Sequence, residues 1–440
     1  MYLGIDFGTS GARACVIAPA RDTPDASALK RYDTAAPSEQ IEDMARIDFG
    51  PLPEHEAAAT WREALYALIA QIPIGMRKRL AGLAIDGTSA TVLACDEALN
   101  PTYPPLPYND ARAVEEAATI GRTIGEKHPA ASATSGLAKV LWLKKHLGLQ
   151  RARLYLNQAD WLSALLSGQP VSDYHNALKM GVDLETGQWP AWVDYLADIN
   201  YLPVLVKPGQ ALGLLNRTRA REFGINPDCL VRAGTTDSIA AFLAAGVNQA
   251  GVAVSSLGST LVLKLLSETR VDAGEYGIYS HWFGSQWLAG GASNAGGAVL
   301  RQHFSDDELR SLSGQINPER SSGLDYYPLP GKGERFPYND PERLPRLEPR
   351  PQDRSEFLHG ILEGLAKIEA GGYARLAELG ATPLQAVVSA GGGAANPVYS
   401  RIRARLLNVP VTQAAEHEAC YGSARLACHG VNLFSGARDD

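Results

Sequence analysis

LGIDFGTSGARACVI, residues 3–17, lies almost at the start of the chain and decides how the rest is interpreted. Apolar residues flank a turn of Gly, Ser and Thr on both sides, a pattern that predicts a β-hairpin. Gly8 and Gly11 allow positive φ angles and a close approach of a ligand to the backbone, so that successive N–H groups can point at one anion. The tip of the hairpin is therefore a candidate cradle for phosphate.

Asp6 stands near the end of the first predicted strand, where a buried position normally carries an apolar residue. A carboxylate is instead a suitable oxygen ligand for Mg²⁺ beside a phosphate. The alternative is an ordinary hairpin with a polar tip, which the motif alone does not exclude.

A second copy of the pattern occurs at residues 252–266, VAVSSLGSTLVLKLL. An apolar strand again leads into a turn, here Gly258, Ser259 and Thr260, and a second apolar strand follows. Two such hairpins, one opening each half of the chain, indicate an internally duplicated α/β fold that binds nucleotide. Because Leu257 takes the place of the carboxylate, we expect the first half to handle the reacting phosphate and the metal, and the second half only to hold phosphate.

The chain of 440 residues exceeds the size at which one hydrophobic core keeps growing, so two domains are expected. Hydrophobic residues make up 45% of the chain and charged residues 20%, as in ordinary globular proteins. The net charge of −7 comes from scattered residues of both signs, without the clustered Lys and Arg that bind a phosphate backbone. We therefore expect no nucleic-acid partner.

The chain shows no targeting or membrane signal. The residues after Met1 enter a strand directly, so no signal peptide is expected. No apolar run approaches the ~20 residues needed to span a bilayer. The five cysteines are odd in number and lack metal-ligand spacing, which favours buried free thiols in a reducing compartment. The expected location is the cytoplasm, with no membrane partner.

Two further polar turns follow predicted strands in the first half. Residues 80–85 form an apolar strand that ends in DGTSA, residues 86–90, and ligands bind at such strand ends in α/β sheets. Asp237 follows the strand and turn of residues 231–236 and begins a helix of small residues. Its plain alternative role is that of a helix N-cap.

Another glycine-rich turn occurs late in the second half. Residues 386–390 are a predicted strand that delivers the glycines 391–393, Asn396 and a helix from Pro397. Three glycines at such a junction allow a flat ligand such as adenosine to lie against the backbone, whereas a turn with an Asn cap explains one glycine better than three. A long helix is expected over roughly 355–379, and an irregular excursion over 18–56.

Together these motifs resemble the FGGY family of carbohydrate kinases, over essentially the whole chain. DFGTS, residues 6–10, is similar to the first phosphate motif of that family, and LGST, residues 257–260, to its second. The glycines 391–393 with Asn396 resemble the adenosine motif. GERFPYNDP, residues 333–341, is nearly diagnostic for the family.

The resemblance implies a two-domain actin/hexokinase/Hsp70-like fold, with ribonuclease H-like halves related by internal duplication. We expect the sugar and catalytic residues in a domain of residues 1–244 and ATP binding in a domain of residues 245–440. A helix at about 418–434 is expected to pack on the first domain. The cleft between the domains should close on sugar and ATP, because an open site would transfer phosphate to water.

The resemblance also implies ATP and Mg²⁺ as cofactors and assigns roles to residues. Asp237 takes the position of the general base, Asp6 holds Mg²⁺ through water, and Thr9 completes the catalytic set. Asp110 and Asp173 are further candidates for the rim of the sugar site. The sugar is assigned to Ser10, Gly11, Ser89, Asp237 and Ser238, and ATP to Gly8, Thr9, Gly258, Ser259, Thr260, Gly296, Gly297, Gly391, Gly392 and Asn396.

Within the family, the turn after the strand 80–85 tracks the sugar. DGTSA resembles the Asp-Ala-Thr-Cys-Ser turn of ribulose kinases more than the Met-His-Gly turn of xylulokinases. With the short chain and the segment SGLDYYPLP, residues 322–330, it resembles the compact D-ribulose kinases of cyanobacteria and plant plastids. The expected reaction is phosphorylation of the terminal primary hydroxyl of a ketopentose, D-ribulose to D-ribulose 5-phosphate, with D-xylulose as the alternative.

Two other classes stay open: a sugar-binding regulator that keeps the kinase fold, and an ATPase-driven scaffold of the Hsp70 type. Retention of Asp6, Thr9 and Asp237 speaks against the regulator, since a protein that only binds sugar needs no general base. An Hsp70-type scaffold would need an additional peptide-binding domain, and the sequence shows no segment for one. The oligomeric state, the pathway and the tolerance for related polyols stay open too.

Overall fold

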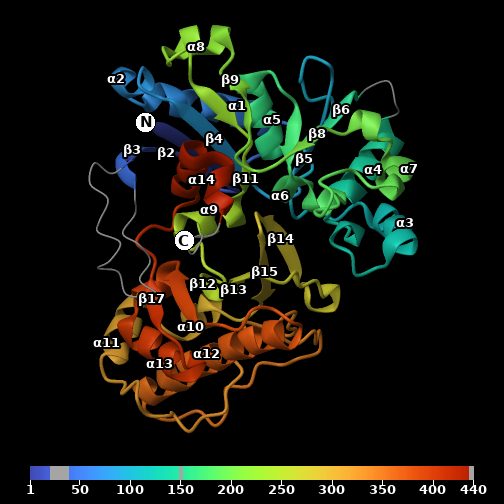
Figure 1. Cartoon of the computed structure of the whole chain (residues 1–440). Coiled ribbons are helices and arrows are strands. Elements are labelled where there is room, and N and C mark those ends of the chain that lie inside the picture. The colour runs from blue at the N-terminus through green and yellow to red at the C-terminus, as the bar shows by residue number, and fades with distance from the viewer. Residues whose placement is uncertain (20–38, 148–151, 436–440) are drawn as a thin grey trace. The chain divides into compact units, whose positions relative to one another are not determined.

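The computed structural model describes residues 1–19, 39–147 and 152–435, which divide into two compact units (Figure 1). Unit 1 contains the described residues up to Ala244 together with the segment Glu416–Ser435. Unit 2 runs from Ala245 to Ala415. The chain thus returns to unit 1 after it has completed unit 2.

Unit 1 is built on a mixed seven-stranded sheet. The order is β3-β2-β1-β4-β10-β9, and β11 pairs with β4 beyond the end of β10. Two small sheets pair β5 with β6 and β7 with β8. The strands of unit 1 are β1 (Tyr2–Phe7), β2 (Gly11–Pro19), β3 (Glu39–Asp48), β4 (Gly82–Gly87), β5 (Val92–Cys95), β6 (Leu154–Asn157), β7 (Val171–Asp173), β8 (Val204–Val206), β9 (Ala211–Leu214), β10 (Leu230–Arg232) and β11 (Thr235–Thr236).

The first predicted hairpin is confirmed, because β1 and β2 pair antiparallel around the turn. The prediction that residues 18–56 are irregular is wrong over Glu39–Asp48, which pairs with β2 as β3. Burial alternates along β3, with Ile41, Ala45 and Ile47 among its inward positions, and its outward positions are mostly charged. Residues 18 and 19 also belong to a strand, β2, whereas residues 49–56 are irregular as predicted. Residues 20–38 lie outside the described residues.

The helices of unit 1 cover its sheets and form the connections. They are α1 (Ala57–Gln71), α2 (Ile74–Arg77), α3 (Val114–Ile124), α4 (Gly136–Leu147), α5 (Gln158–Ser167), α6 (Tyr174–Ala177), α7 (Ala191–Ala197), α8 (Arg217–Phe223), α9 (Asp237–Ala244) and α14 (Ala419–His429). Single turns of 3₁₀-helix lie at Pro129–Ala131, Leu178–Met180, Ile199–Tyr201 and Gly430–Phe434.

Helix α14, drawn in red, lies among the early elements of unit 1 (Figure 1). A Cβ added to Gly422 would meet the carbonyl oxygen of Ala240 in α9 at 1.8 Å, and one added to Gly4 would meet that of Cys420 at 2.1 Å. Both glycines therefore allow backbone-to-backbone packing. The helix predicted at about 418–434 ends earlier, at His429, because Gly430 adopts φ of 58°.

Unit 2 repeats the plan of unit 1 with the sheet order β14-β15-β13-β12-β16-β17. Strands β12 and β13 form the second predicted hairpin, and β16 runs parallel to β12 as β4 does to β1. The predicted internal duplication is thereby confirmed. The strands are β12 (Val252–Leu257), β13 (Leu261–Ser267), β14 (Tyr279–Phe283), β15 (Gln286–Ser293), β16 (Ala386–Ala390) and β17 (Val411–Gln413).

The strand ends correct one detail of the sequence comparison. Phe7 and Leu257 are the last residues of β1 and β12, and a glycine follows each. The residue of unit 2 that matches Asp6 is therefore Ser256, not Leu257.

Four α-helices and two short 3₁₀ turns complete the described part of unit 2. They are α10 (Gly297–His303), α11 (Asp306–Ser313), α12 (Arg354–Glu378) and α13 (Pro397–Leu407), with 3₁₀ turns at Gly274–Tyr276 and Gly392–Ala395. The long helix predicted at roughly 355–379 is confirmed as α12. Its buried face packs into the core of this unit, with Leu358, Ile361 and Leu362 almost fully buried.

No helix in the described ranges is long and apolar enough to cross a membrane. All five cysteines are free; four are buried and Cys428 is half-buried.

Candidate active site

Two buried carboxylates lie side by side on neighbouring strands of unit 1. Strands β1 and β4 are parallel, and their register pairs Asp6 with Asp86. Strand β11 pairs with β4 so that Thr235 lies level with Asp86, and it leads directly into Asp237 at the first residue of α9. Carboxylates from three separate parts of the chain therefore gather at the carboxyl ends of these strands, where ligands bind in α/β sheets.

Burial determines the protonation of the Asp6–Asp86 pair. It raises the pKa of Asp86 well above its usual value, and the charge of Asp6 raises it further, while a 2.5 Å hydrogen bond from Ser423 Oγ opposes the rise. Burial also raises the pKa of Asp6, but hydrogen bonds from Asp86 and from Arg13 Nη1, the latter 3.2 Å long, counteract it. Asp86 is therefore the member that holds the proton, and Asp6 carries the negative charge.

The tip of the first hairpin presents oxygen atoms beside Asp6. Thr9 and Ser10 are exposed, and their hydroxyls form no hydrogen bond with any residue that the structure describes. The N–H of Gly8 donates to the carbonyl of Gly11 at 3.0 Å, so the turn is closed by its own backbone. A carboxylate with neighbouring hydroxyls is a hard oxygen donor set, which fits Mg²⁺.

Gly8 and Gly11 do not adopt the positive φ angles predicted for them. A Cβ added to Gly11 would meet the carbonyl oxygen of Ile47 on β3 at 2.5 Å, whereas one at Gly8 would make only an ordinary 3.5 Å contact. Gly11 is therefore explained by the close approach of two strands. The sequence interpretation missed this reason because it did not expect β3.

The turn after β4 is held from two sides. Gln158 Oε1, at the start of α5, accepts hydrogen bonds of 3.0 Å from both the N–H and the hydroxyl of Thr88. Lys139 Nζ donates to the carbonyl oxygens of Ala90 and Pro107 at 2.8 and 2.6 Å. Ala90 adopts φ of 64°, an unfavourable angle that needs such support. Burial lowers the pKa of Lys139 to about 7.

Ser89 lies on this turn and is half-buried. Its hydroxyl forms no hydrogen bond within the described part of the chain, so it is available to a ligand. At the start of α9, the N–H of Ser238 donates to Asp237 Oδ1 at 2.6 Å.

The two rim candidates have structural partners. Asp110 is paired with Arg112 Nη2 at 2.6 Å. Asp173 is buried and caps α6 by accepting hydrogen bonds from the N–H groups of His175 and Asn176 at 2.9 and 3.1 Å. Burial raises the pKa of Asp173 to about 6, although these hydrogen bonds oppose the rise. Capping accounts for Asp173 without a ligand.

A cavity of about 840 Å³ opens beside the second hairpin in unit 2. Its volume suits a nucleotide-sized ligand. Apolar side chains and glycines dominate its lining, and the polar side chains there come mainly from α10 and α11. The lining includes Leu257, Gly258, Ser259, Gly296, Gly297, Leu300, Arg301, Arg310, Leu362, Gly392, Gly393 and Asn396.

Gly296 and Gly297 bring the start of α10 against the hairpin tip. Gly296 adopts φ of 153°, and a Cβ there would meet the carbonyl oxygen of Ser259 at 2.6 Å. A Cβ at Gly297 would meet that of Gly258 at 2.8 Å, and the N–H of Gly297 donates to the same oxygen. No side chain larger than hydrogen fits at either position without movement.

The three glycines after β16 are not equivalent. Gly391 adopts φ of 81°, and Cβ atoms at Gly391 and Gly393 would meet atoms of Leu257 at 3.1 and 2.8 Å. A Cβ at Gly392 would meet nothing within 4 Å. Packing on the hairpin therefore explains two of the glycines, and only Gly392 faces open space in the cavity.

Asn396 acts as the helix cap that the sequence left open as its alternative. Its Oδ1 accepts from the N–H groups of Val398 and Tyr399 at 3.0 and 3.1 Å, and its Nδ2 donates to Ser313 Oγ at 2.9 Å. The helix predicted from Pro397 is confirmed as α13. Asn396 thus joins α11 to α13 at the cavity wall.

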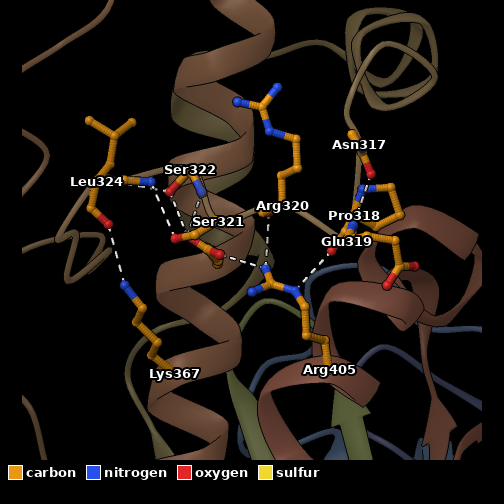
Figure 2. A network of polar contacts seen from close by, with 11 residues as sticks. Asn317, Pro318, Glu319, Arg320, Ser321, Ser322, Leu324, Lys367 and Arg405 are labelled. Atoms are coloured by element: carbon orange, nitrogen blue, oxygen red, sulfur yellow. Dashed lines mark hydrogen bonds and ion pairs between the residues drawn. The ribbon is translucent and has the colours of Figure 1, made fainter.

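A polar network fastens the segment 317–324 to α12 and α13 (Figure 2). Glu363 accepts hydrogen bonds from the N–H and hydroxyl of Ser322 at 3.0 and 2.5 Å, and Arg405 Nη2 donates to Glu363 at 2.5 Å. Arg405 Nε also reaches the carbonyl of Pro318 at 2.9 Å. Since this segment continues from α11, the network stabilises one wall of the cavity.

Family models match both parts of the chain. Residues 1–244 match the N-terminal domain of the FGGY family of carbohydrate kinases, and residues 253–431 match its C-terminal domain. The chain belongs to the FGGY family of carbohydrate kinases.

Curated relatives of this FGGY kinase include the xylulose kinase of Lactococcus lactis, 23% identical over 98% of this chain and 88% of the relative. The xylulose kinase of Staphylococcus xylosus is 24% identical over 98% of this chain and 91% of the relative. They support the family and give no support to the narrower resemblance to compact D-ribulose kinases.

Solved structures confirm the predicted two-domain fold. The xylulose kinase of Rhodospirillum rubrum has a TM-score of 0.80 at 21% identity, and the match covers 99% of this chain and 92% of that one. Plasmodium falciparum glycerol kinase with ADP has a TM-score of 0.77 at 16% identity, covering 98% and 89%.

The FGGY motif GERFPYNDP has a visible structural role in this kinase. Glu334 is buried and accepts hydrogen bonds from Ser293 Oγ at 2.7 Å, from the N–H of Asn294 at 2.8 Å and from the hydroxyl of Tyr327 at 3.0 Å. It thereby holds the end of β15 just before Gly296. The motif supports the glycine turn at the cavity.

Several residues of this FGGY kinase were missed as site candidates. Asp86 was quoted only as part of a turn, although an acidic residue ending a buried strand gave the same signal as Asp6. Arg301 Nη2 donates to Ser259 Oγ at 2.6 Å beside the cavity, and nothing in its local sequence marks it. Ser423 reaches Asp86 only because α14 returns to unit 1.

Proposed function

We propose that this FGGY kinase transfers the γ-phosphoryl group of ATP to the terminal primary hydroxyl of a ketopentose, with D-xylulose as the first candidate. The gathering of Asp6, Asp86 and Asp237 at adjacent strand ends carries the proposal. The names of the relatives favour D-xylulose over D-ribulose.

Asp237 is the proposed general base. The acceptor oxygen attacks the γ-phosphorus, the bond from phosphorus to the β–γ bridging oxygen breaks, and ADP leaves. The proton of the acceptor hydroxyl passes to the carboxylate of Asp237. A carboxylate suffices because the hydroxyl becomes acidic as its oxygen bonds to phosphorus.

Asp6 is proposed to hold Mg²⁺ through water, since it carries the charge of the buried pair. A bound Mg²⁺ would neutralise part of the negative charge on the phosphates. Thr9 and the backbone of residues 8–11 are proposed to contact the transferred phosphate. Ser10, Gly11, Ser89 and Ser238 are proposed to bind the sugar, and the free hydroxyls of Ser10 and Ser89 support this assignment.

ATP is proposed to occupy the 840 Å³ cavity of unit 2. The turn of residues 258–260 and the glycines Gly296 and Gly297 are assigned to the phosphates. Gly391, Gly392 and Asn396 are assigned to the adenosine. The functional division into residues 1–244 for the sugar and 245–440 for ATP is part of the proposal.

D-Ribulose is the second candidate, and the turn DGTSA favours it. This turn carries Ser89, whose hydroxyl is available to a sugar, and it resembles the turn of ribulose kinases. One changed hydroxyl contact can alter specificity by orders of magnitude, so this turn can outweigh overall similarity.

The test is ADP release from MgATP with D-xylulose, D-ribulose, L-ribulose, glycerol, ribitol or no sugar. Wild type is compared with Asp237→Asn and with Asp228→Asn, which makes the same chemical change at an exposed position of unit 1. We expect stimulation by D-xylulose, a fall of roughly 10²–10⁴ in turnover for Asp237→Asn, and none for Asp228→Asn.

The outcomes separate the alternatives. Preference for D-ribulose would keep the mechanism and select the second candidate. Sugar binding without ADP release would favour a regulator. ADP release that does not depend on sugar and is unchanged in Asp237→Asn would contradict the proposed sugar kinase activity.

A further inference from the structure

Strand β11 contains only two residues and leads directly into Asp237. On one edge it is held by β4, where Thr235 lies level with Asp86. Just before it, Gly234 lies so close to β4 that an added Cβ would meet the carbonyl oxygen of Ile85 at 1.8 Å. Among the described strands β11 pairs with β4 alone, so no strand supplies a restraint on its other edge.

The side chain of His175 supplies that restraint. His175 Nδ1 and Thr235 Oγ1 are hydrogen-bonded at 2.7 Å. His175 is 1% exposed and Thr235 is fully buried, so water does not compete for this bond. The bond joins α6 to β11 at a point two residues before Asp237.

His175 is itself held firmly. Its N–H and that of Asn176 are bonded to the capping Asp173, and Asn176 Nδ2 also donates to Asp173 at 2.6 Å. The imidazole ring packs edge-on against Phe434, with 5.7 Å between ring centroids. Because both the backbone and the ring of His175 are restrained, its side chain can in turn restrain the position of Thr235.

We propose that His175 is a positioning residue for Asp237. Through Thr235 it determines where β11 turns into α9, and so where the Asp237 carboxylate points. This inference rests on the proposed role of Asp237 as the base. Because the direction of the carboxylate matters at proton transfer more than in sugar binding, loss of the bond lowers kcat and leaves KM nearly unchanged.

Four variants test this. Thr235→Val removes the hydroxyl and keeps the shape, and Thr235→Ser keeps the hydroxyl. His175→Leu removes the ring nitrogen, and His175→Asn returns a polar atom near the position of Nδ1. The measurements are kcat, KM for the best sugar, KM for MgATP and the thermal unfolding midpoint.

We expect Thr235→Val and His175→Leu to lower kcat roughly 10- to 100-fold with both KM values within about twofold of wild type. Thr235→Ser and His175→Asn should keep most of the activity. The double variant His175→Leu/Thr235→Val should be no slower than either single variant, since both remove the same bond.

Wild-type kcat in a folded Thr235→Val variant would overturn the inference, even with a lowered unfolding midpoint, because the bond would then be only structural. Equal losses in Thr235→Val and Thr235→Ser would overturn it too. If His175→Leu does not fold, the comparison of Thr235→Val with Thr235→Ser decides between the outcomes. A wild type without sugar-dependent ADP release would instead reject the proposed function, and this inference with it.

Discussion

The two sheets share five strands in the same order, and the residues that these strands pair near their carboxyl ends differ between the units. In unit 1 the register pairs Asp6 with Asp86, whereas at the matching level of unit 2 it pairs Ser256 with Ala390. The same framework therefore ends in two buried carboxylates in one unit and in small uncharged residues beside an apolar cavity in the other.

In the proposed function, the two units divide the work along this difference. Burial raises the pKa values of both carboxyl groups, which means that ionising either of them costs stability in unit 1. Such a cost is typical of functional sites. Unit 2 carries no such cost at this level, and its glycines instead let the backbone pack closely against the hairpin tip beside the cavity.

Removing the carboxylate from unit 1 should have the largest effect. We expect Asp6→Asn to lower kcat by roughly 10²–10³, the loss typical for one group that stabilises transition-state charge. The unfolding midpoint should not fall, because a neutral amide costs less to bury than the charged carboxylate. Kinetics at varied Mg²⁺ and calorimetry check this, with Asp228→Asn as the control; a folded variant with wild-type kcat contradicts it.

Adding a side chain at the close glycine contacts of unit 2 should have the second-largest effect. Gly296→Ala places a methyl group 2.6 Å from a backbone oxygen at φ of 153°, so we expect a loss of about 1–3 kcal/mol in stability and a KM for ATP raised at least about tenfold. Gly392→Ala is the matched control, since its methyl meets nothing within 4 Å, and it should unfold like wild type. Equal destabilisation of both variants would contradict this account.

Placing a carboxylate in unit 2 should have a smaller effect. Ser256→Asp places a carboxylate at the position of unit 2 that matches Asp6 of unit 1. We expect it to weaken ATP binding by roughly tenfold, about 1.4 kcal/mol, through repulsion of the phosphates. Ser256→Asn is similar in size and uncharged, so it should bind ATP as wild type does. Titration calorimetry of both variants gives the comparison, and similar affinities would mean that charge at this level does not matter.

The last prediction concerns stability alone and not activity. Lys139 supports the turn after β4. Its pKa is about 7 in the folded chain against an ordinary 10.5, so between these values the unfolded chain binds more protons. The free energy of unfolding should therefore rise with pH in this window, by about 1.4 kcal/mol per pH unit for one proton. Lys139→Met should flatten the rise; urea unfolding at pH 6, 7.5 and 9 measures it. An unchanged slope would show that Lys139 is not its source.

Much of the fold could be predicted from local patterns. Both hairpins, the long helix and the helix from Pro397 follow from apolar periodicity, turn residues and caps, which act over a few residues. The strand Glu39–Asp48 was missed because its outward face is mostly charged and its composition suggested a loop. Because β3 was not predicted, its close contact with Gly11 could not be predicted either.

The sequence by itself determined the duplication, the family motifs and the position of each polar turn at a strand end, because these depend on neighbouring residues. Only the tertiary structure decided which side chains meet. Asp86 is placed between Asp6 and Thr235 by strand register, and Ser423 bonds to it from 337 positions along the chain. His175 reaches Thr235 across 60 positions. Such contacts depend on how strands pair and helices pack, which no local pattern specifies.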